Sequence, residues 1–251
     1  MRYIYVLATM LFPVISLAAP VFVYGPGGPA PAMEAAARAF NAKSGNREVQ
    51  ITYGPTDKWL NAAKTNADMI YSGSENMMTD FVTKLPEQIV ADTIKPIYLR
   101  PAAILVRARN PDHIRGFKSL LKPGVNIMVV QGAGQTGLWE DIAGRSGHVS
   151  TIAALRKNIV YYAPNSALAL KRWKDDASIK AWIIYNIWSI AHPGVAEVIP
   201  LSRHYVIYRD MGVALTKSGQ SNKTAMAFER FLLSQAGFNI FHHFGWSRSA
   251  N

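Results

Sequence analysis

The sequence predicts an α/β fold built mainly from parallel strands. Short runs rich in β-branched and aromatic residues alternate with longer runs of helical periodicity, and this happens three times in the first third of the chain. The alternation is typical of βαβ units, in which helices connect parallel strands. The predicted pairs are strand Val21–Tyr24 with helix Ala30–Phe40, strand Val49–Tyr53 with helix Asp57–Asn66, and strand Asp68–Tyr71 with helix Asn76–Phe81.

The rest of the chain continues this alternation and then ends in helices. Further strands are expected at Ile97–Arg100, Ala102–Arg107, Val125–Val130, Ile159–Ala163, Ala181–Tyr185 and Val206–Tyr208, with helices at Leu138–Gly144 and Ser166–Lys174. Two consecutive helices, Ser221–Ser234 and Gln235–His243, close the chain, and Ser221 is expected to cap the first of them.

Two extended runs lie where a two-lobed protein could cross between its lobes. They are Arg100–Arg107 and Tyr205–Thr216, about a third and four-fifths of the way along the chain. The alternative is that both are ordinary core strands of one sheet. Periodicity alone does not separate these two arrangements.

Length and composition limit the kind of protein. The 251 residues are 49% hydrophobic and 17% charged, which is a globular composition with room for one large domain or two lobes. The absence of cysteine excludes disulfides, thiolate metal sites and cysteine nucleophiles. The 27 basic residues outnumber the 16 acidic ones, which favours anionic partners. The basic residues are scattered singly and match no nucleic-acid-binding motif, so no nucleic acid is expected as a partner.

The N-terminus reads as a secretory signal. Arg2 is followed by the uncharged apolar stretch Tyr3–Leu17, and cleavage after Ala18 places small residues at the two positions that a signal peptidase reads. The apolar run is shorter than the ~20 residues of a membrane-spanning helix. We therefore expect a signal peptide at residues 1–18, a mature chain that starts at Ala19, and export to the periplasm.

Three loops of the first half join a predicted strand to a predicted helix and carry glycine or hydroxyl groups. Glycine lets backbone N–H groups approach a ligand closely, and the N-terminus of a helix favours negative charge. The alternative is that these are plain turns whose hydroxyls only cap helices. The candidate ligand-binding residues in these loops are Gly27, Gly28, Thr56, Lys58, Ser72 and Ser74.

The loop Gly132–Gly137 follows a predicted strand and has the spacing G-x-G-x-x-G. A dinucleotide site needs an acidic residue about 20 positions further on, where the chain has none before Asp175. A P-loop needs Lys followed by Ser or Thr, where the chain has Leu138 and Trp139. A nest of backbone amides for a single oxyanion remains. The candidates of this half are Thr136 and Gly137, with Asn165 and Ser166 in the loop before a later helix.

Motifs for catalysis and for metal binding are missing from the sequence. No G-x-S-x-G is present, since Gly144-Arg145-Ser146-Gly147 is followed by His148, and the six histidines show no H-x-x-x-H spacing. We therefore expect no enzyme, no metal site and no cofactor. Tyr185 is retained as a ligand candidate, although the aromatic cluster around it is more typical of a core.

Five ordered stretches resemble the accessory colonization factor (AcfC-type) branch of type II periplasmic solute-binding proteins, which are relatives of sulfate- and molybdate-binding proteins. The likeness covers essentially the whole mature chain. The stretches are Tyr24–Pro31, Gly54–Trp59, Asn66–Met78, Gly132–Asp141 and Arg209–Lys217.

The resemblance implies a two-lobed periplasmic binding protein type II fold, with two hinge crossovers and a ligand cleft between the lobes. The first lobe would consist of residues 19–103 and 209–251, and the second of residues 104–208. By motif position, the first lobe would contribute Gly27, Gly28, Thr56, Lys58 and Ser74 to the cleft, and the second Thr136, Gly137, Asn165 and Ser166. Arg209 would add a cation near the hinge, unless its side chain faces solvent.

The function that the resemblance implies is the capture of a small anion for an ABC-type membrane transporter or a sensor. The anion would be a sulfate-like oxyanion or a phosphorylated or carboxylated metabolite, and homodimers occur among members of the family. The alternative is a secreted adhesin or surface antigen with a vestigial ligand cleft.

Overall fold

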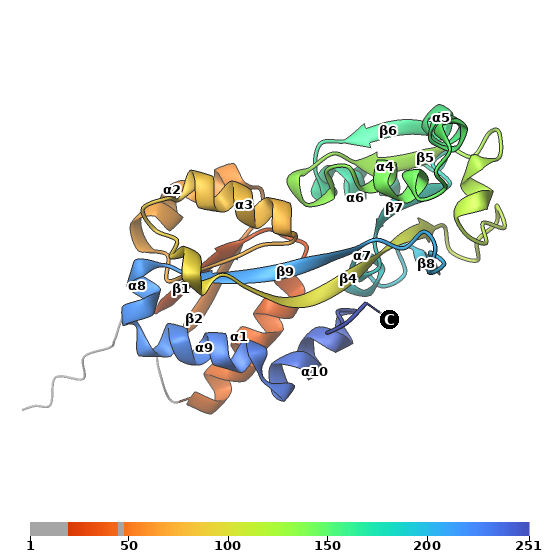
Figure 1. Cartoon of the computed structure of the whole chain (residues 1–251). Helices are drawn as coiled ribbons and strands as arrows, with labels where there is room; N and C mark the ends of the chain where they lie inside the picture. The colour runs from red at the N-terminus through yellow and green to blue at the C-terminus, as the bar shows by residue number, and fades with distance from the viewer. Residues whose placement is uncertain (1–19, 45–47, 251) are drawn as a thin grey trace, which may run out of the picture.

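The computed structural model describes residues 20–44 and 48–250, so the expected signal peptide at 1–18 lies outside the described residues. Two groups of helices and strands are joined by two long strands that run through the middle of the molecule (Figure 1). These strands are β4 (Lys95–Val106) and β9 (Tyr208–Leu215). We refer to the two groups as lobe 1 and lobe 2.

Lobe 1 is built from the three strand–helix pairs at the start of the chain. Strand β1 lies in the middle and pairs in parallel with both of its neighbours, in the register Val21 to Val49 and Val23 to Met69. The strands are β1 (Val21–Gly25), β2 (Val49–Tyr53) and β3 (Met69–Tyr71), and the helices are α1 (Ala30–Ser44), α2 (Thr56–Asn66) and α3 (Glu75–Lys84).

Lobe 2 repeats this parallel arrangement around a different central strand, β5, which is buried along its whole length. Such continuous burial is typical of a parallel strand that is covered on both faces. The strands are β5 (Ile127–Val130), β6 (Ile159–Ala163), β7 (Ala181–Tyr185) and β8 (Glu197–Pro200), and the helices are α4 (Leu138–Gly144), α5 (Val149–Asn158), α6 (Ser166–Asp175) and α7 (Ile187–Ala191).

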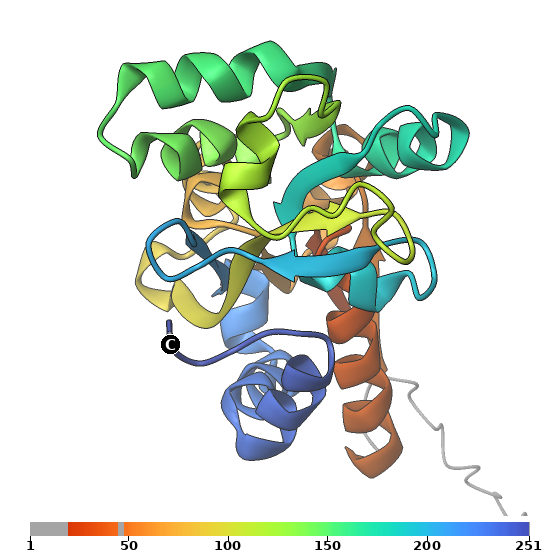
Figure 2. The ribbon, with the colours of Figure 1, turned by 90° about the vertical axis from the view of Figure 1, so that its right-hand side faces the viewer.

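The crossover strands unite both lobes in one nine-stranded sheet of order β2-β1-β3-β9-β4-β7-β5-β6, with β8 beside β4. Strand β4 pairs with β9 over Lys95–Pro101 and then with β7 and β8 over Ala102–Val106. The two extended runs of the sequence are therefore crossovers as well as core strands. Figure 2 shows the result from the side, with α4 and α5 of lobe 2 at one end and the C-terminal helices at the other.

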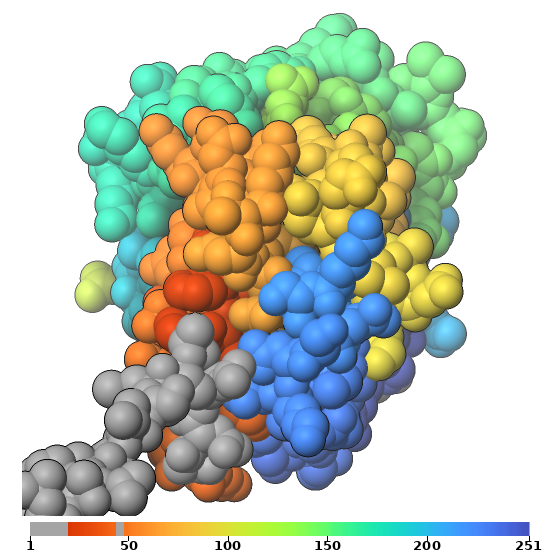
Figure 3. All heavy atoms as spheres, turned by 90° about the vertical axis from the view of Figure 1, so that its left-hand side faces the viewer, coloured from red at the N-terminus to blue at the C-terminus, as the bar shows by residue number. Residues whose placement is uncertain are grey.

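The C-terminal helices belong to lobe 1, and two of them, α9 (Lys223–Leu233) and α10 (Gln235–His243), pack beside α1. The rings of Phe40 and Phe228 lie 5.3 Å apart between α1 and α9. Beyond α10 the chain returns to the crossover, where Ser247 and Leu99 exchange both backbone hydrogen bonds at 2.7 and 2.8 Å. Figure 3 shows the outer face of lobe 1, with α2 and α3 in orange and yellow above the blue C-terminal helices. These helices are α8 (Lys217–Ser221), α9 (Lys223–Leu233) and α10 (Gln235–His243).

Some sequence predictions were wrong in detail. Strands are parallel inside each lobe, but every pair that involves β4 or β9 is antiparallel. Ser221 ends α8 instead of capping a longer helix, because the Asn222 side chain accepts hydrogen bonds from the next helix start and caps α9. Helix α5 was not predicted, because its apolar residues do not follow a clear helical periodicity. Its first residue, Val149, is 82% exposed and does not pack into the core. The strand expected at Val206–Tyr208 starts only at Tyr208.

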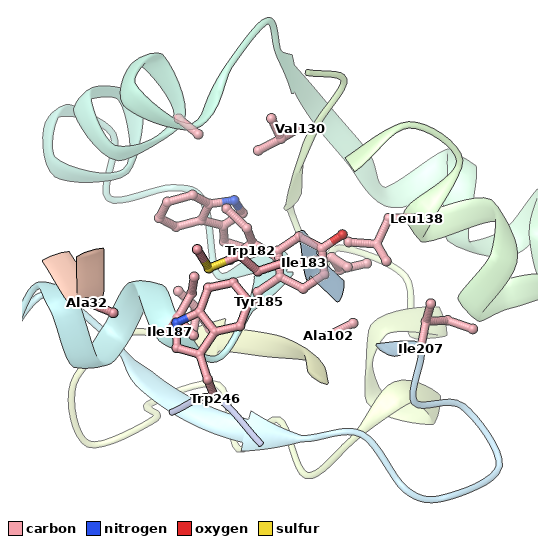
Figure 4. Packing of buried hydrophobic residues seen from close by; sticks show 14 of the residues in the cluster. Ala32, Ala102, Val130, Leu138, Trp182, Ile183, Tyr185, Ile187, Ile207 and Trp246 are labelled. Carbon is pink, nitrogen blue, oxygen red and sulfur yellow. The ribbon is translucent and has the colours of Figure 1, made fainter. Parts of the chain in front are cut away.

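A large hydrophobic core connects the lobes beneath the crossover. Trp182, Tyr185, Ile187 and Trp246 all belong to this core and lie close together in Figure 4. Trp246 comes from the C-terminal segment, whereas the other three come from β7 and α7. Burial of such large apolar side chains stabilises the fold, and Ile187 also lines the site described next.

Candidate functional site

A cavity of about 560 Å³ lies between the lobes. Lobe 1 contributes the loops that follow β1, β2 and β3, and lobe 2 contributes the loops that follow β5 and β6, together with α7. Ligands of open α/β sheets bind beyond the carboxyl ends of the parallel strands, and these are the ends that line the cavity.

Arg100 of β4 lies at this cavity and is only 2% exposed. One Nη2–H donates to the Gly73 carbonyl, whereas Nε is buried and has no hydrogen-bond partner among the described residues. The guanidinium carbon lies 3.8 Å from the centre of the Tyr185 ring and 5.3 Å from that of Trp246. Burial lowers the pKa of Arg100 to about 10, so the side chain is still a cation at neutral pH.

The described residues that line the cavity supply no opposite charge to this cation, although the charges of Glu75 and Asp210, which do not line it, partly offset the lowering of its pKa. Among the described residues that line the cavity, Arg100 is the sole arginine, and none is a lysine, an aspartate or a glutamate. A buried cation that forms no ion pair is costly, because the Gly73 carbonyl and the two aromatic rings replace only part of the solvation that burial removes. An anion that enters the cavity would supply that missing partner.

Three glycines from three loops surround the guanidinium. A Cβ atom on Gly28 would lie 2.9 Å from Nη1, and one on Gly73 would lie 3.0 Å from Nη2. A Cβ on Gly134 of lobe 2 would lie 3.5 Å from the same Nη2. The glycine-rich loops therefore make room for an arginine, a reason that the sequence analysis did not foresee.

The helices α1, α2 and α6 begin at the wall of the cavity, as does the short helix α7. The first N–H groups of a helix lack intrahelical partners and carry partial positive charge, which favours an anion nearby. At α6 the side chain of Asn165 accepts from the N–H of Leu168 at 2.9 Å, so the N–H groups of Ser166 and Ala167 are left for other acceptors. These helix ends add to the field of Arg100.

The structure brings together a first group of the residues predicted from sequence. Loops from both lobes place them at the same cavity, although they are up to 139 positions apart in the chain. The predicted residues that line it are Gly27, Gly28, Thr56, Asn165 and Ser166.

A second group lies beneath the lining and supports it. The Tyr185 hydroxyl donates to the Gly134 carbonyl at 2.6 Å and so holds the lobe 2 loop over Arg100. Ser72 accepts from the N–H of Gly212 at 3.1 Å, and Ser74 caps α3 by accepting from the N–H of Met77 at 3.1 Å.

A third group lies outside the lining. Lys58 and Thr136 are exposed, and the Thr136 hydroxyl is 3.5 Å from the Gly132 carbonyl. Gly137 precedes α4 with a φ of 71°, in the left-handed region that favours glycine. The chain thus turns into α4 at this glycine, away from the cavity wall.

The side chain of Arg209 is only 18% exposed, and it does not line the cavity. Its guanidinium contacts Glu75 of α3 at 3.2 Å and Asp141 of α4 at 2.8 Å, so it joins the two lobes. The neighbouring Asp210 is partly buried beside Glu75, and burial followed by the charge of Glu75 raises its pKa to about 6.

Sequence reasoning missed Arg100 and the aromatic residues Trp188 and His192 of the lining. Arg100 did carry a signal, because it interrupts the apolar run of a predicted buried strand, where a lone arginine needs a reason. Burial, and then the charge of Lys174, lower the pKa of His192.

The described part of the chain contains no group of three or more histidine or acidic side chains placed to hold a metal ion. None of the helices in residues 20–44 and 48–250 is long and apolar enough to span a membrane.

Comparison with known proteins agrees with this geometry. Residues 21–247 match the family of bacterial extracellular solute-binding proteins. PEB3 bound to L-phospholactate is 33% identical, with a TM-score of 0.85 over 91% of this chain and 100% of that chain. PEB3 from Campylobacter jejuni is 32% identical, with a TM-score of 0.84 over the same shares of the two chains.

More distant structures share the fold. The sulfate-binding protein SubI from Mycobacterium tuberculosis is 17% identical, with a TM-score of 0.72 over 91% of this chain and 86% of that chain. The periplasmic molybdate-binding protein of Azotobacter vinelandii is 14% identical, with a TM-score of 0.69 over 92% of this chain and 100% of that chain. No curated protein sequence matches the chain. The two-lobed fold and the predicted type II resemblance are confirmed, and the chain belongs to the family of bacterial extracellular solute-binding proteins.

Proposed function

We propose that this chain is a periplasmic solute-binding protein that captures a small anion between its lobes and presents it to an ABC-type membrane transporter or a sensor. The observation that carries the proposal is Arg100, a buried cation that forms no ion pair with a described carboxylate and that lies at an interlobe cavity whose lining contains no acidic residue. The chain performs no chemistry on the anion in this proposal, because the cavity lining contains no nucleophile next to a base.

The similar proteins support an anion as the ligand. PEB3 has been seen with L-phospholactate, which carries a phosphate and a carboxylate, and SubI binds sulfate. A phosphorylated or carboxylated metabolite, or a sulfate-like oxyanion, fits a cavity whose fixed charge is positive.

We further propose that the lobes comprise residues 19–103 with 209–251 and residues 104–208, and that they close on the ligand by bending at the crossovers. Strand β4 supports this division, because its pairing changes from β9 to β7 between Pro101 and Ala102. Hinges of this kind are a few residues at the ends of elements.

The test is the melting temperature of the mature chain with sulfate, phosphate, molybdate, phosphoglycerate, citrate and aspartate at matched ionic strength. A ligand at about 100 times its dissociation constant stabilises by about 2.7 kcal/mol, which is a shift of roughly 5–10 °C for a chain of this size. We expect one class of anion to give this shift. If none of the six anions raises the melting temperature, the proposal is contradicted and the alternative, a secreted adhesin or surface antigen, is favoured.

A further inference from the structure

The cavity has two unlike parts. One part is the guanidinium of Arg100 with the glycine loops around it. The other part comes from α6, α7 and the residue after α7, and presents Leu170, Trp188 and His192. We call the pair Trp188 and His192 the aromatic wall.

The aromatic wall lies close to the anion part and is held firmly. Ile187, the residue before Trp188, approaches within 4.0 Å of the position of a Cβ on Gly28, and Gly28 borders Arg100. The rings of Trp188 and His192 are stacked at 5.4 Å with 24° between their planes. Behind them the Trp182 ring lies 6.0 Å from that of Trp188, so the wall is backed by the core.

A bare inorganic oxyanion would use only one of these parts. Its charge and oxygens fit Arg100 and the helix ends, but it offers nothing to an apolar surface. The cavity volume of about 560 Å³ falls in the range of about 300–1,000 Å³ that is common for pockets that hold small organic molecules. Apolar surface next to a fixed charge is the arrangement that selects an anion with a carbon body attached.

We propose that the ligand is an organic phosphate or sulfate ester whose apolar carbon body packs against the aromatic wall, and that Trp188 sets the preference for the ester over the bare ion. The inference rests on the proposed function, because Arg100 must hold the anionic group. Trp188 is then a specificity-determining residue, and Arg100 provides affinity for either kind of anion.

The experiment is titration calorimetry of the mature chain with inorganic phosphate and with phenyl phosphate, at about pH 8 where both are mainly dianions. We expect phenyl phosphate to bind about tenfold more tightly, since an aromatic contact of about 1.4 kcal/mol corresponds to that factor. In Trp188→Ala the tenfold preference disappears, whereas the affinity for inorganic phosphate changes less than about twofold.

Two further variants test the role of Trp188 even if Trp188→Ala folds poorly. Trp188→Phe retains a ring against Trp182 and is expected to keep most of the preference. Tyr161→Ala is the matched control, because Tyr161 is a half-buried aromatic residue of lobe 2 that contacts Arg172 and does not line the cavity. It should leave both affinities unchanged.

The results distinguish failure of the aromatic wall from failure of the anion site. Equal affinity of the natural chain for both compounds, or an equal loss of both in Trp188→Ala, overturns the role of the aromatic wall but leaves the anion site intact. If phosphate affinity is the same in Arg100→Gln as in the natural chain, the anion site at Arg100 is wrong and this inference fails with it. If neither compound binds, this inference fails, whereas the proposed function is then decided by the melting temperatures with the other anions.

Discussion

The two crossover strands each carry an arginine at directly opposed positions, Arg100 on β4 and Arg209 on β9. Residues opposed in this way project from the same face of a sheet, so both guanidinium groups belong to the interlobe region. Arg209, whose side chain is 18% exposed, is neutralised by Glu75 and Asp141. Arg100 is buried and meets a carbonyl and two aromatic rings instead of a carboxylate. The comparison shows that the ion-paired Arg209 links the two lobes. Arg100 forms no ion pair, so its charge is available to a ligand.

The largest effect on anion affinity is expected for Arg100→Gln, which removes the cation at the cavity. The anion would lose a charge-assisted hydrogen bond worth about 1.5–3 kcal/mol, so we expect affinity to fall about 10- to 100-fold by calorimetry. The same replacement at the exposed Arg115, far from the lining, is the control and should have no effect. Unchanged binding in Arg100→Gln would refute the assigned role of this arginine.

A weaker disturbance comes from adding one methyl group beside Arg100. In Gly28→Ala the new Cβ would lie 2.9 Å from Nη1, so the guanidinium must move and affinity should fall about five- to tenfold. Gly27→Ala is the matched control, since its Cβ would meet only the Tyr53 ring, at 4.0 Å. Equal affinities of the two variants would show that the position of Arg100 does not matter.

Arg209→Gln should mainly affect the contact between the lobes. The two ion pairs are partly exposed, and such pairs contribute about 0–1 kcal/mol each, so we expect a loss of about 1 kcal/mol in the free energy of unfolding. A double-mutant cycle with Asp141→Asn measures the interlobe pair separately. An effect on anion affinity as large as that of Arg100→Gln would contradict the division of roles.

The pH dependence of stability reports on the charges around Arg209. The pKa of Asp210 is raised from 3.8 to about 6, so the folded state holds a proton that the unfolded state releases. Its contribution to stability is fully present below about pH 3.8 and is lost as the pH rises through about 6. Asp210→Asn should flatten this part of the profile, as measured by urea unfolding between pH 4 and 8. An unchanged slope would show that other groups control it.

The smallest effects are expected at Lys58 and Thr136. The sequence indicated both as candidate ligand-binding residues, but both side chains lie outside the cavity lining. We therefore expect a change below about threefold for Lys58→Ala, which salt should reduce further because the charge is exposed. Thr136→Ala should have no salt dependence. A larger loss in either variant would show that closure of the lobes brings that side chain to the ligand.

Much of this arrangement was readable from the sequence. The central strands of the two lobes, β1 and β5, carry apolar runs. The loops after the parallel strands carry the glycines and helix starts that reach the cavity, so Gly28 and Asn165 were found by local pattern. Local signals suffice here because strand, turn and helix start are set by residues close in the chain.

Only the tertiary structure separated Arg100 from Arg209. Both arginines lie in extended runs. The apolar neighbours of Arg100 indicate a buried strand, but no local signal shows that Arg100 forms no ion pair while Arg209 contacts Glu75 and Asp141. Those partners are 134 and 68 positions away from Arg209 in the chain. The sequence by itself determined the βα units, the extended runs and the glycine loops. Long-range packing decided that the extended runs are crossovers and which cation forms no ion pair, because strand pairing, burial and charge neutralisation depend on what the fold brings together.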